Sequence, residues 1–124
     1  MTIEVNNLTS DRIDEKFLKK AVGLVLTWEK KEKNLSLALV GQKRIKELNR
    51  KYRKKNEATD VLSFHYDDSG EIILCPPVIR KNAKKYGLPF KEELSRITIH
   101  GLLHLLGYGH QKIIKKEEYY LSKI

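Results

Sequence analysis

The sequence has few of the residues that mark membrane, secreted or fibrous proteins. One cysteine, Cys75, and three prolines occur in its 124 residues. A single cysteine excludes an internal disulfide scaffold and agrees with a reducing cytosol. The longest apolar run, Ala21–Leu26, is far shorter than the roughly 18 residues that a membrane span needs. The first residues, MTIEVNN, lack the basic head and apolar core of a secretory signal, so we expect a cytoplasmic protein.

A net positive charge is the main compositional feature that is present. Lysine and arginine number 25 against 16 acidic residues, which gives a formal net charge of +9 and a pI near 9.6. A small domain this basic commonly meets a polyanion, such as nucleic acid or an anionic membrane surface, or an acidic partner. A solvated surface rich in lysine and glutamate, as in many thermophilic proteins, explains the same charge. With 40% apolar residues, the chain has the length and composition of a single domain over residues 1–124.

Hydrophobic periodicity predicts alternating strands and helices in the first half of the chain. Residues 2–5 and 35–39 are predicted strands. Between them, Ser10 and Asp11 are the predicted cap of a helix. Its apolar stripe has helical spacing and consists of Ile13, Phe17, Ala21, Leu24 and Trp28. A short basic helix follows the second strand, with an apolar side formed by Ile45, Leu48 and Tyr52.

The second half predicts a hairpin and three helices. Residues 61–66 and 71–75 flank the turn at 67–70, which is typical of a β-hairpin. Pro76 and Pro77 end the second strand of this hairpin and open a helix that stops at Gly87. Another helix runs from Pro89 to Gly107, and a last amphipathic helix leads to Ile124. The order β-α-β-α-β-β-α-α-α predicts an α+β domain with helices packed on a small mixed sheet.

Three of the four histidines form the strongest chemical signal in the sequence. His100 and His104 are four residues apart, so on a helix their side chains share one face. Gly107 and Gly109 allow the chain to turn and bring His110 back toward them. Three imidazoles without a fourth protein ligand are typical of a catalytic zinc site with an open position. The alternative, ordinary core histidines, does not account for the spacing and the glycines together.

The same spacing also matches the metzincin proteases, H-E-x-x-H-x-x-G-x-x-H. Those enzymes carry a glutamate as general base directly after the first histidine. Here that position is Gly101, which has no side chain to accept a proton. Peptide hydrolysis by this mechanism is therefore disfavoured.

A basic segment lies between residues 43 and 55, with one acid, Glu47. Its basic residues are Lys43, Arg44, Lys46, Arg50, Lys51, Arg53, Lys54 and Lys55, and all of them except Lys46 are candidates for binding the phosphates of RNA. Tyr52 has two interpretations. It stacks on a base, as aromatic residues do in single-strand binders, or it turns into the core at its helical spacing from Leu48.

Several segments together resemble the YbeY family of bacterial endoribonucleases. The stretch His100–His110 reads H-G-L-L-H-L-L-G-Y-G-H and is similar to the family signature H-G-x-L-H-L-x-G-Y-D-H. Residues 48–53 (LNRKYR) and 59–64 (TDVLSF) resemble a second signature, and residues 70–73 (GEII) resemble a third. These segments occur in the family's order and span about half of the chain.

The resemblance implies a small α+β domain with a mixed four-stranded sheet and a zinc-dependent endoribonuclease specific for single strands. The family acts in ribosome biogenesis, including late maturation of the 3′ end of 16S rRNA, and in ribosome quality control. Its implied partners are single-stranded RNA, ribosomal RNA and the small ribosomal subunit; neither a membrane nor DNA specificity is expected. By motif match, His100, His104 and His110 are the implied zinc ligands, and Arg53 is the functionally important arginine. A site of three histidines also accepts nickel, cobalt or copper.

This sequence departs from the family pattern at three positions. Gly109 stands where an aspartate normally precedes the last histidine, which puts any task of that carboxylate in doubt. Glu71 replaces the aspartate of the third segment, and His65 replaces a proline. We expect His65 to be a loop or strand residue and not a fourth ligand.

The expected mechanism uses a metal-bound water to hydrolyse the RNA backbone, with Arg53 holding the scissile phosphate. The catalytic set is therefore Arg53, His100, His104 and His110. The sequence shows no general acid for the leaving oxygen. A second hypothesis is a non-catalytic RNA- or ribosome-binding assembly factor with a structural metal. A metalloprotease is the third.

Overall fold

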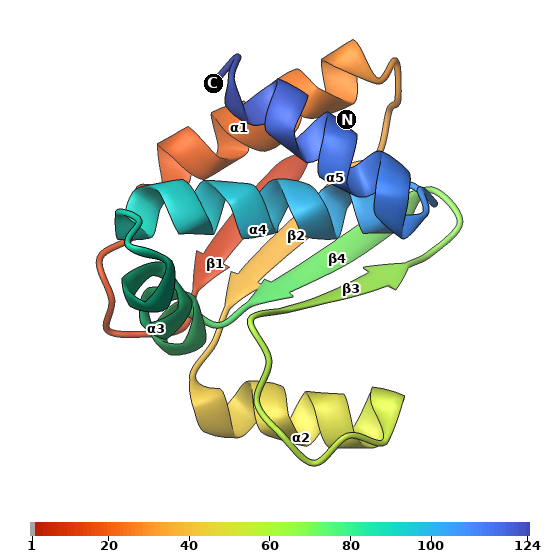
Figure 1. Ribbon diagram of the computed structural model, residues 1–124. Coiled ribbons are helices and arrows are strands. Elements are labelled where there is room, and N and C mark those ends of the chain that lie inside the picture. The colour runs from red at the N-terminus through yellow and green to blue at the C-terminus, as the bar shows by residue number, and fades with distance from the viewer. Residues whose placement is uncertain (1) are drawn as a thin grey trace.

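The chain forms four strands and five helices in the predicted order, in a computed structural model that describes residues 2–124 (Figure 1). The strands are β1 (Ile3–Asn7), β2 (Asn34–Leu39), β3 (Val61–His65) and β4 (Ser69–Leu74). The helices are α1 (Glu15–Trp28), α2 (Gln42–Arg53), α3 (Pro76–Tyr86), α4 (Phe90–Leu105) and α5 (His110–Leu121). The α+β class and the mixed four-stranded sheet are thus confirmed. No helix within residues 2–124 is long and apolar enough to cross a membrane.

The sheet has the strand order β1-β2-β4-β3. β1, β2 and β4 are parallel, whereas β3 pairs antiparallel with β4 as the first arm of the predicted hairpin. The register of that hairpin places Val61 opposite Leu74 and His65 opposite Gly70. β3 is therefore an edge strand, and its two faces pack against different clusters.

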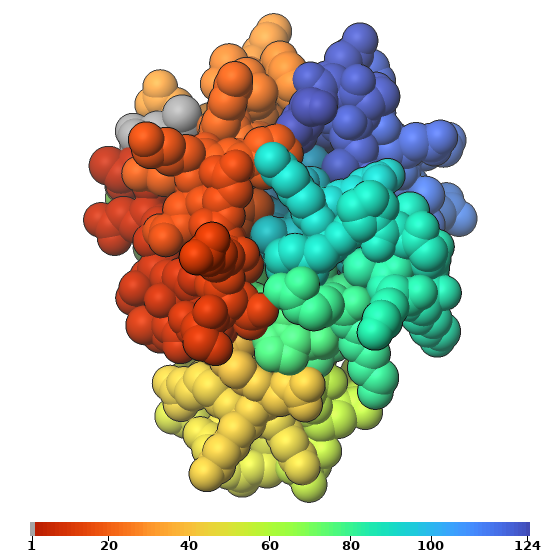
Figure 2. Space-filling view, turned by 90° about the vertical axis from the view of Figure 1, so that its left-hand side faces the viewer, coloured from red at the N-terminus to blue at the C-terminus, as the bar shows by residue number. Residues whose placement is uncertain are grey.

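The two faces of the sheet carry different cores. α1, α4 and α5 lie over one face, with α4 across the strands (Figure 1). There the alternate residues Leu35, Leu37 and Leu39 of β2 join the larger buried cluster. A smaller cluster beneath α2 contains Ile45 and Leu62, among others. The space-filling view shows α2, in yellow, at the end of the molecule opposite α5, in blue (Figure 2).

Most of the predicted stop signals are confirmed, but the cap of α1 is not where the sequence analysis put it. Asp14, instead of Ser10 or Asp11, caps α1 by accepting a hydrogen bond from the Phe17 amide at 3.0 Å. Asp11 lies before the helix and pairs with Arg80 at 2.7 Å. Because Asp11 is bound to a residue of α3, it is not available to the first turn of α1.

The other terminators behave as predicted. α3 ends at Gly87 and the turn after α4 contains Gly107, and both glycines have positive φ, 68° and 95°. This left-handed conformation favours glycine, which has no Cβ to clash with the backbone. The turn at Gly107 separates α4 from α5, so His110 becomes the first residue of α5.

α4 approaches the sheet closely because it has a glycine at the contact. A Cβ at Gly101 would lie 2.9 Å from Val61 Cγ2 and 3.3 Å from Ile72 Cγ2. A Cβ on the facing Gly70 of β4 would lie 2.5 Å from Leu105 Cδ1. This close contact explains why residue 101 is a glycine. A glutamate at this position would point into the sheet. This geometry strengthens the case against the metzincin mechanism.

We predict opposite effects for alanine at two glycines in the middle of helices. Gly101→Ala is expected to lower the free energy of unfolding by about 1–2 kcal/mol, because overpacking exceeds the gain in helix propensity. Gly23→Ala in α1 is the matched control, since its Cβ would meet Ile3 Cδ1 at an ordinary 3.5 Å. It is expected to raise the free energy by about 0.5–1 kcal/mol. Urea unfolding of both variants measures this, and equal effects would contradict the packing argument.

Candidate active site

A cleft of about 540 Å³ opens between α4, the beginning of β3 and the end of α2. We call it the histidine cleft, because His100, His104 and His110 all line it together with Arg53. The remaining lining comes from the start of β3 and from α4, and consists of Thr59, Asp60, Val61, Leu62, Ser63, Arg96, Ile97 and Gly101. The four residues predicted to be catalytic are thus brought together from three separate helices.

A polar stripe runs along α4, and three of its four residues line this cleft. Glu93, Arg96, His100 and His104 are spaced by three, four and four residues, so they lie along one side. The adjoining side packs on the sheet through Gly101. The spacing of the stripe is visible in the sequence, but only its two histidines were predicted to be functional.

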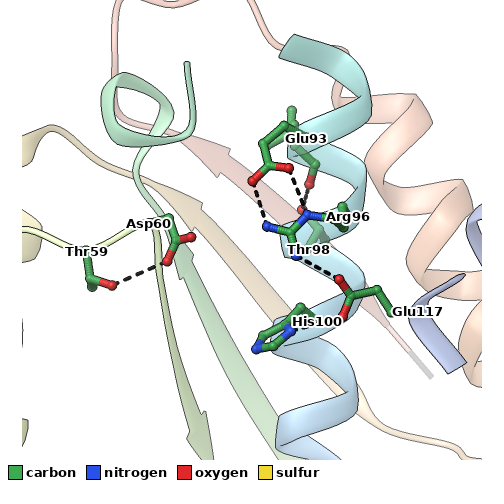
Figure 3. A network of polar contacts seen from close by, with 8 residues as sticks. Thr59, Asp60, Glu93, Arg96, Thr98, His100 and Glu117 are labelled. Atoms are coloured by element: carbon green, nitrogen blue, oxygen red, sulfur yellow. Dashed lines mark hydrogen bonds and ion pairs between the residues drawn. The ribbon is translucent and has the colours of Figure 1, made fainter. Parts of the chain in front are cut away.

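Arg96 links two buried carboxylates along this stripe (Figure 3). Its guanidinium donates to both oxygens of Glu93, at 2.8 and 2.7 Å, and to Oε1 of Glu117 at 2.8 Å. The Glu93 side chain is fully buried and that of Glu117 is 8% exposed. Hydrogen bonding to Glu93, more than any other contact, raises the pKa of Arg96, so it stays charged and offsets the cost of burying both carboxylates.

Glu117 connects this network to the first histidine. Its Oε2 lies 3.1 Å from Nδ1 of His100. Burial alone would raise the pKa of Glu117, but hydrogen bonds from His100 and Arg96 outweigh it and lower the pKa below its usual value. An ionised carboxylate only accepts hydrogen bonds, so Nδ1 of His100 carries the hydrogen. In a neutral imidazole with its hydrogen on Nδ1, Nε2 is the nitrogen that offers a lone pair to a metal ion.

His110 reaches the cleft from the start of α5, and a buried carboxylate anchors the turn before it. Glu29 accepts hydrogen bonds from Tyr108, Tyr120 and Lys116. Burial would raise the pKa of Glu29, but these bonds, led by that of Lys116, hold it below its usual value. Because Tyr108 is two residues from His110, Glu29 ties the end of α1 to the turn that carries the third histidine.

Gly109, directly before His110, departs from the family pattern and affects the start of α5. Gly109 is the N-cap of α5, with an extended φ of −78° and no side-chain cap. An aspartate there would accept a hydrogen bond from the first turn of the helix. Its absence therefore leaves α5 without a side-chain cap, and the ligand proposal does not depend on it.

Three imidazoles are suitable ligands for a metal ion by their chemistry. That the three rings converge on one ion stays a prediction. Among residues 2–124, no three His, Cys, Asp or Glu side chains are placed so that they could hold an ion together. The three imidazoles nevertheless line the same cleft, and His104 and His110 are exposed. The hydrogen bond between His100 and Glu117 is the arrangement that commonly orients a metal-binding histidine.

The structure adds Asp60 to the candidate residues. It lies directly before β3 and lines the cleft, facing α4 across it (Figure 3). Its Oδ1 is 3.3 Å from the Thr59 hydroxyl. Asp60 belongs to the TDVLSF segment but had no predicted role, because only the position of β3 relative to α4 brings it to the histidines.

The basic residues of segment 43–55 do not all lie at the histidine cleft. Arg53, the last residue of α2, lines the histidine cleft. The other candidates for RNA binding are exposed but do not line it: Lys43, Arg44, Arg50, Lys51, Lys54 and Lys55. Tyr52 is 56% exposed and packs edge-on against Phe64 at 5.2 Å, so it is not a core residue. His65 ends β3 on the surface, 3.0 Å from Lys33 Nζ, and does not line the cleft.

Comparisons with known proteins agree on one family. A family model described as "Endoribonuclease YbeY" matches residues 3–122. The chain is 37% identical to "Endoribonuclease YbeY" of Persephonella marina, with 97% of this chain and 86% of the relative covered. It is 35% identical to that of Thermotoga neapolitana, with 98% and 81% covered. The solution structure of TM1509 from Thermotoga maritima is similar, with a TM-score of 0.72, 29% identity, and 98% of this chain and 87% of that one covered.

We predict that Arg96 is the structural link of the site. Arg96→Gln leaves Glu93 and Glu117 buried without their charged partner, and is expected to lower the free energy of unfolding by about 3 kcal/mol. Arg44→Gln is the control, since that arginine is exposed and 3.7 Å from Glu47, and is expected to cost less than about 0.5 kcal/mol. Chemical denaturation at pH 7 measures both. A similar small loss in the two variants would show that the network contributes little.

Proposed function

The chain belongs to the YbeY endoribonuclease family, and we propose from this that it is a metal-dependent endoribonuclease acting on single-stranded RNA. The observation that carries the proposal is the histidine cleft, in which Arg53 lies together with His100, His104 and His110. The net charge of +9 suits a polyanionic substrate. Neither observation alone indicates cleavage of RNA, but the family membership and the cleft together favour it.

The three histidines would hold the ion, for which zinc is the first choice and nickel an alternative. When bound, it would supply Lewis acidity to a phosphoryl oxygen and to a water molecule. Glu117 lies within hydrogen-bond distance of His100 Nδ1 and would thereby leave Nε2 of that ring to bind the metal. Arg96 holds Glu117 in place from the same side of α4.

Arg53 and Asp60 have separate tasks in this proposal. The Arg53 guanidinium offers paired N–H donors that match the oxygens of a phosphate, and it would stabilise the charge that builds up there during cleavage. Asp60 is the carboxylate of the cleft lining, and we assign to it the transfer of a proton to or from the reacting oxygens. It is a candidate for the general acid that the sequence did not reveal.

The natural substrate is proposed to be ribosomal RNA on the small ribosomal subunit in the cytoplasm, with late maturation of the 3′ end of 16S rRNA as the task. The support is the family membership and the basic α2 beside the cleft, whose exposed cations suit an RNA backbone. Quality control of ribosomes is a further role of the same kind.

We predict that cleavage depends on added zinc and on His104. Metal-stripped protein is expected not to cleave a labelled single-stranded RNA, and activity is expected to return when zinc is added. His104→Ala is expected to lose both tight zinc binding and activity, because two imidazoles hold zinc more weakly than three. Zinc binding by calorimetry and RNA cleavage on a gel measure the two effects separately.

The same experiment tests the proposal against its main alternative. His104→Ala purified in the same way serves as the control for a contaminating ribonuclease. Salt-sensitive RNA binding without cleavage in the zinc-loaded protein would indicate a non-catalytic assembly factor with a structural metal. Cleavage equal in both proteins would reject the assigned site.

We predict that Arg53 acts on the substrate and not on the metal. Arg53→Ala is expected to keep zinc affinity and to lose about 100-fold or more in cleavage rate, since it removes a charged donor from the phosphate. Arg50→Ala is the matched control, because Arg50 is an exposed arginine of the same helix that does not line the cleft. It is expected to weaken RNA binding slightly and to leave the rate at saturating RNA unchanged. Equal rates for Arg53→Ala and wild type would remove Arg53 from the mechanism.

A further inference from the structure

A second hollow lies on the other face of the sheet and plays no part in the site described above. It has a volume of about 380 Å³ and is lined by β2, β3, β4 and α2, with further residues from the end of β1. Its sheet residues, such as Ser36 and Ala38, alternate with the leucines of β2 that face α1 and α4. It therefore opens on the face away from the three-helix layer. We call this hollow the sheet groove.

The sheet groove has a small-residue floor and aromatic walls. Ser36 and Ala38 occupy the middle of the sheet with short side chains, which leaves space above β2. Tyr52 of α2, Phe64 of β3 and Tyr66 just after β3 stand around that space. Tyr52 and Tyr66 are 56% and 52% exposed, so their rings are not buried in the core. Exposed aromatic rings gathered at one hollow are typical of surfaces that bind flat ligands or bases.

The charge around the groove favours a nucleic acid over a protein or a second copy of the chain. The lining itself contains one cation and one anion, Arg44 and Glu71, so the floor is close to neutral. The wall formed by α2 is strongly basic, and Lys51 Nζ lies 5.2 Å from the Tyr52 ring. A neutral aromatic floor with a cationic rim suits bases stacked inside and phosphates outside. A second copy of this chain, at +9, would bring like charge to the same rim.

The groove and the histidine cleft both border the edge strand β3 and the end of α2. β3 is the edge strand, and its alternate residues serve the two hollows: Ser63 bonds to the Gly101 carbonyl of α4 at 2.9 Å, while Phe64 lines the groove. In α2, Tyr52 lines the groove and its neighbour Arg53 lines the cleft. A single strand of RNA that passes around the edge of β3 would therefore meet both hollows.

We propose that the sheet groove binds bases of the single-stranded RNA that flanks the scissile phosphate, with stacking on Tyr66 and Tyr52 and phosphate contacts from Arg44 and Lys51. This inference rests on the proposed RNA substrate and adds a base-binding subsite to it. Glu71 would repel a phosphate, but its oxygens accept hydrogen bonds from the amino groups of bases. The groove therefore selects unpaired strands, whose bases are free to unstack and enter.

The test measures RNA binding without cleavage. In the His104→Ala background, a fluorescein-labelled 12-nucleotide single-stranded RNA is titrated and its anisotropy followed. Tyr66→Ala is expected to weaken the affinity about five-fold or more, because it removes a stacking platform. Tyr66→Phe keeps the ring and is expected to keep the affinity. Tyr86→Ala is the matched control, a 55% exposed tyrosine of α3 outside the groove, and is expected to change the affinity less than two-fold.

An abasic oligonucleotide of the same length separates stacking from charge. It keeps the phosphates, so it is expected to bind Tyr66→Ala and the His104→Ala parent equally. Three results would overturn the proposal. Tyr66→Ala and its parent could bind the normal RNA with equal affinity, or Tyr86→Ala could lose as much affinity as Tyr66→Ala. The third is that Tyr66→Ala weakens binding of the abasic strand as much as binding of the normal RNA. Self-association that Tyr66→Ala abolishes, with RNA affinity unchanged, would assign the groove to a second copy. Failure of the zinc-loaded wild type to cleave RNA rejects the endoribonuclease proposal separately, since binding is read without turnover.

Discussion

The close packing of α4 on the sheet at Gly101 decides which side chains reach the histidine cleft. With no side chain at this position, the helix backbone comes close enough for Val61 and Ile72 to fill the space of a Cβ. This contact fixes the rotation of α4 about its axis. His100 and His104 then lie on the flank of the helix that lines the cleft beside β3. Interiors are packed densely, so a rotated helix would require repacking of the main core. The site is thus held by a rigid element, as precise positioning of a ligand or a phosphate requires.

Electrostatics completes what packing begins. Two carboxylates beside α4 are buried, which is costly unless a cation pairs with them. Arg96 supplies that cation from the same polar stripe, and the arrangement leaves one oxygen of Glu117 for His100. In other proteins, replacing a buried ion-pair network by well-packed hydrophobic residues often leaves the stability of the fold unchanged or raises it. The network therefore makes most sense as a device that orients His100, and this explains why charged groups lie in a helix that otherwise contributes leucine and isoleucine to the core.

Much of the fold was predictable because its signals are local. The strands β2 to β4 and the ends of α3 and α4 follow from alternation, proline and glycine, which act within a few residues. The predicted cap of α1 was wrong because Asp11 pairs with Arg80, which is 69 residues away in the sequence. The histidines were found by their spacing. Glu117 and Asp60 were not predicted, because only the packing of α5 and β3 against α4 brings Glu117 to His100 and Asp60 to the cleft. Tyr52 stays exposed because Phe64 offers it an edge-on contact at the rim and not a place in the core.

The edge strand β3 joins the two halves of the functional surface, and this places a strict demand on its register. Successive residues of a strand face opposite sides, so a slip of one residue would exchange those that face α4 with those that face α2. Val61 and Ser63 would leave the histidine cleft, and Phe64 would leave the sheet groove. Edge strands have one partner only and are the easiest to shift. Here the hairpin with β4 and the hydrogen bond from Ser63 to Gly101 hold the register from both sides. The contact at Gly101 therefore sets α4 and β3 together, and the cleft and the groove both depend on it.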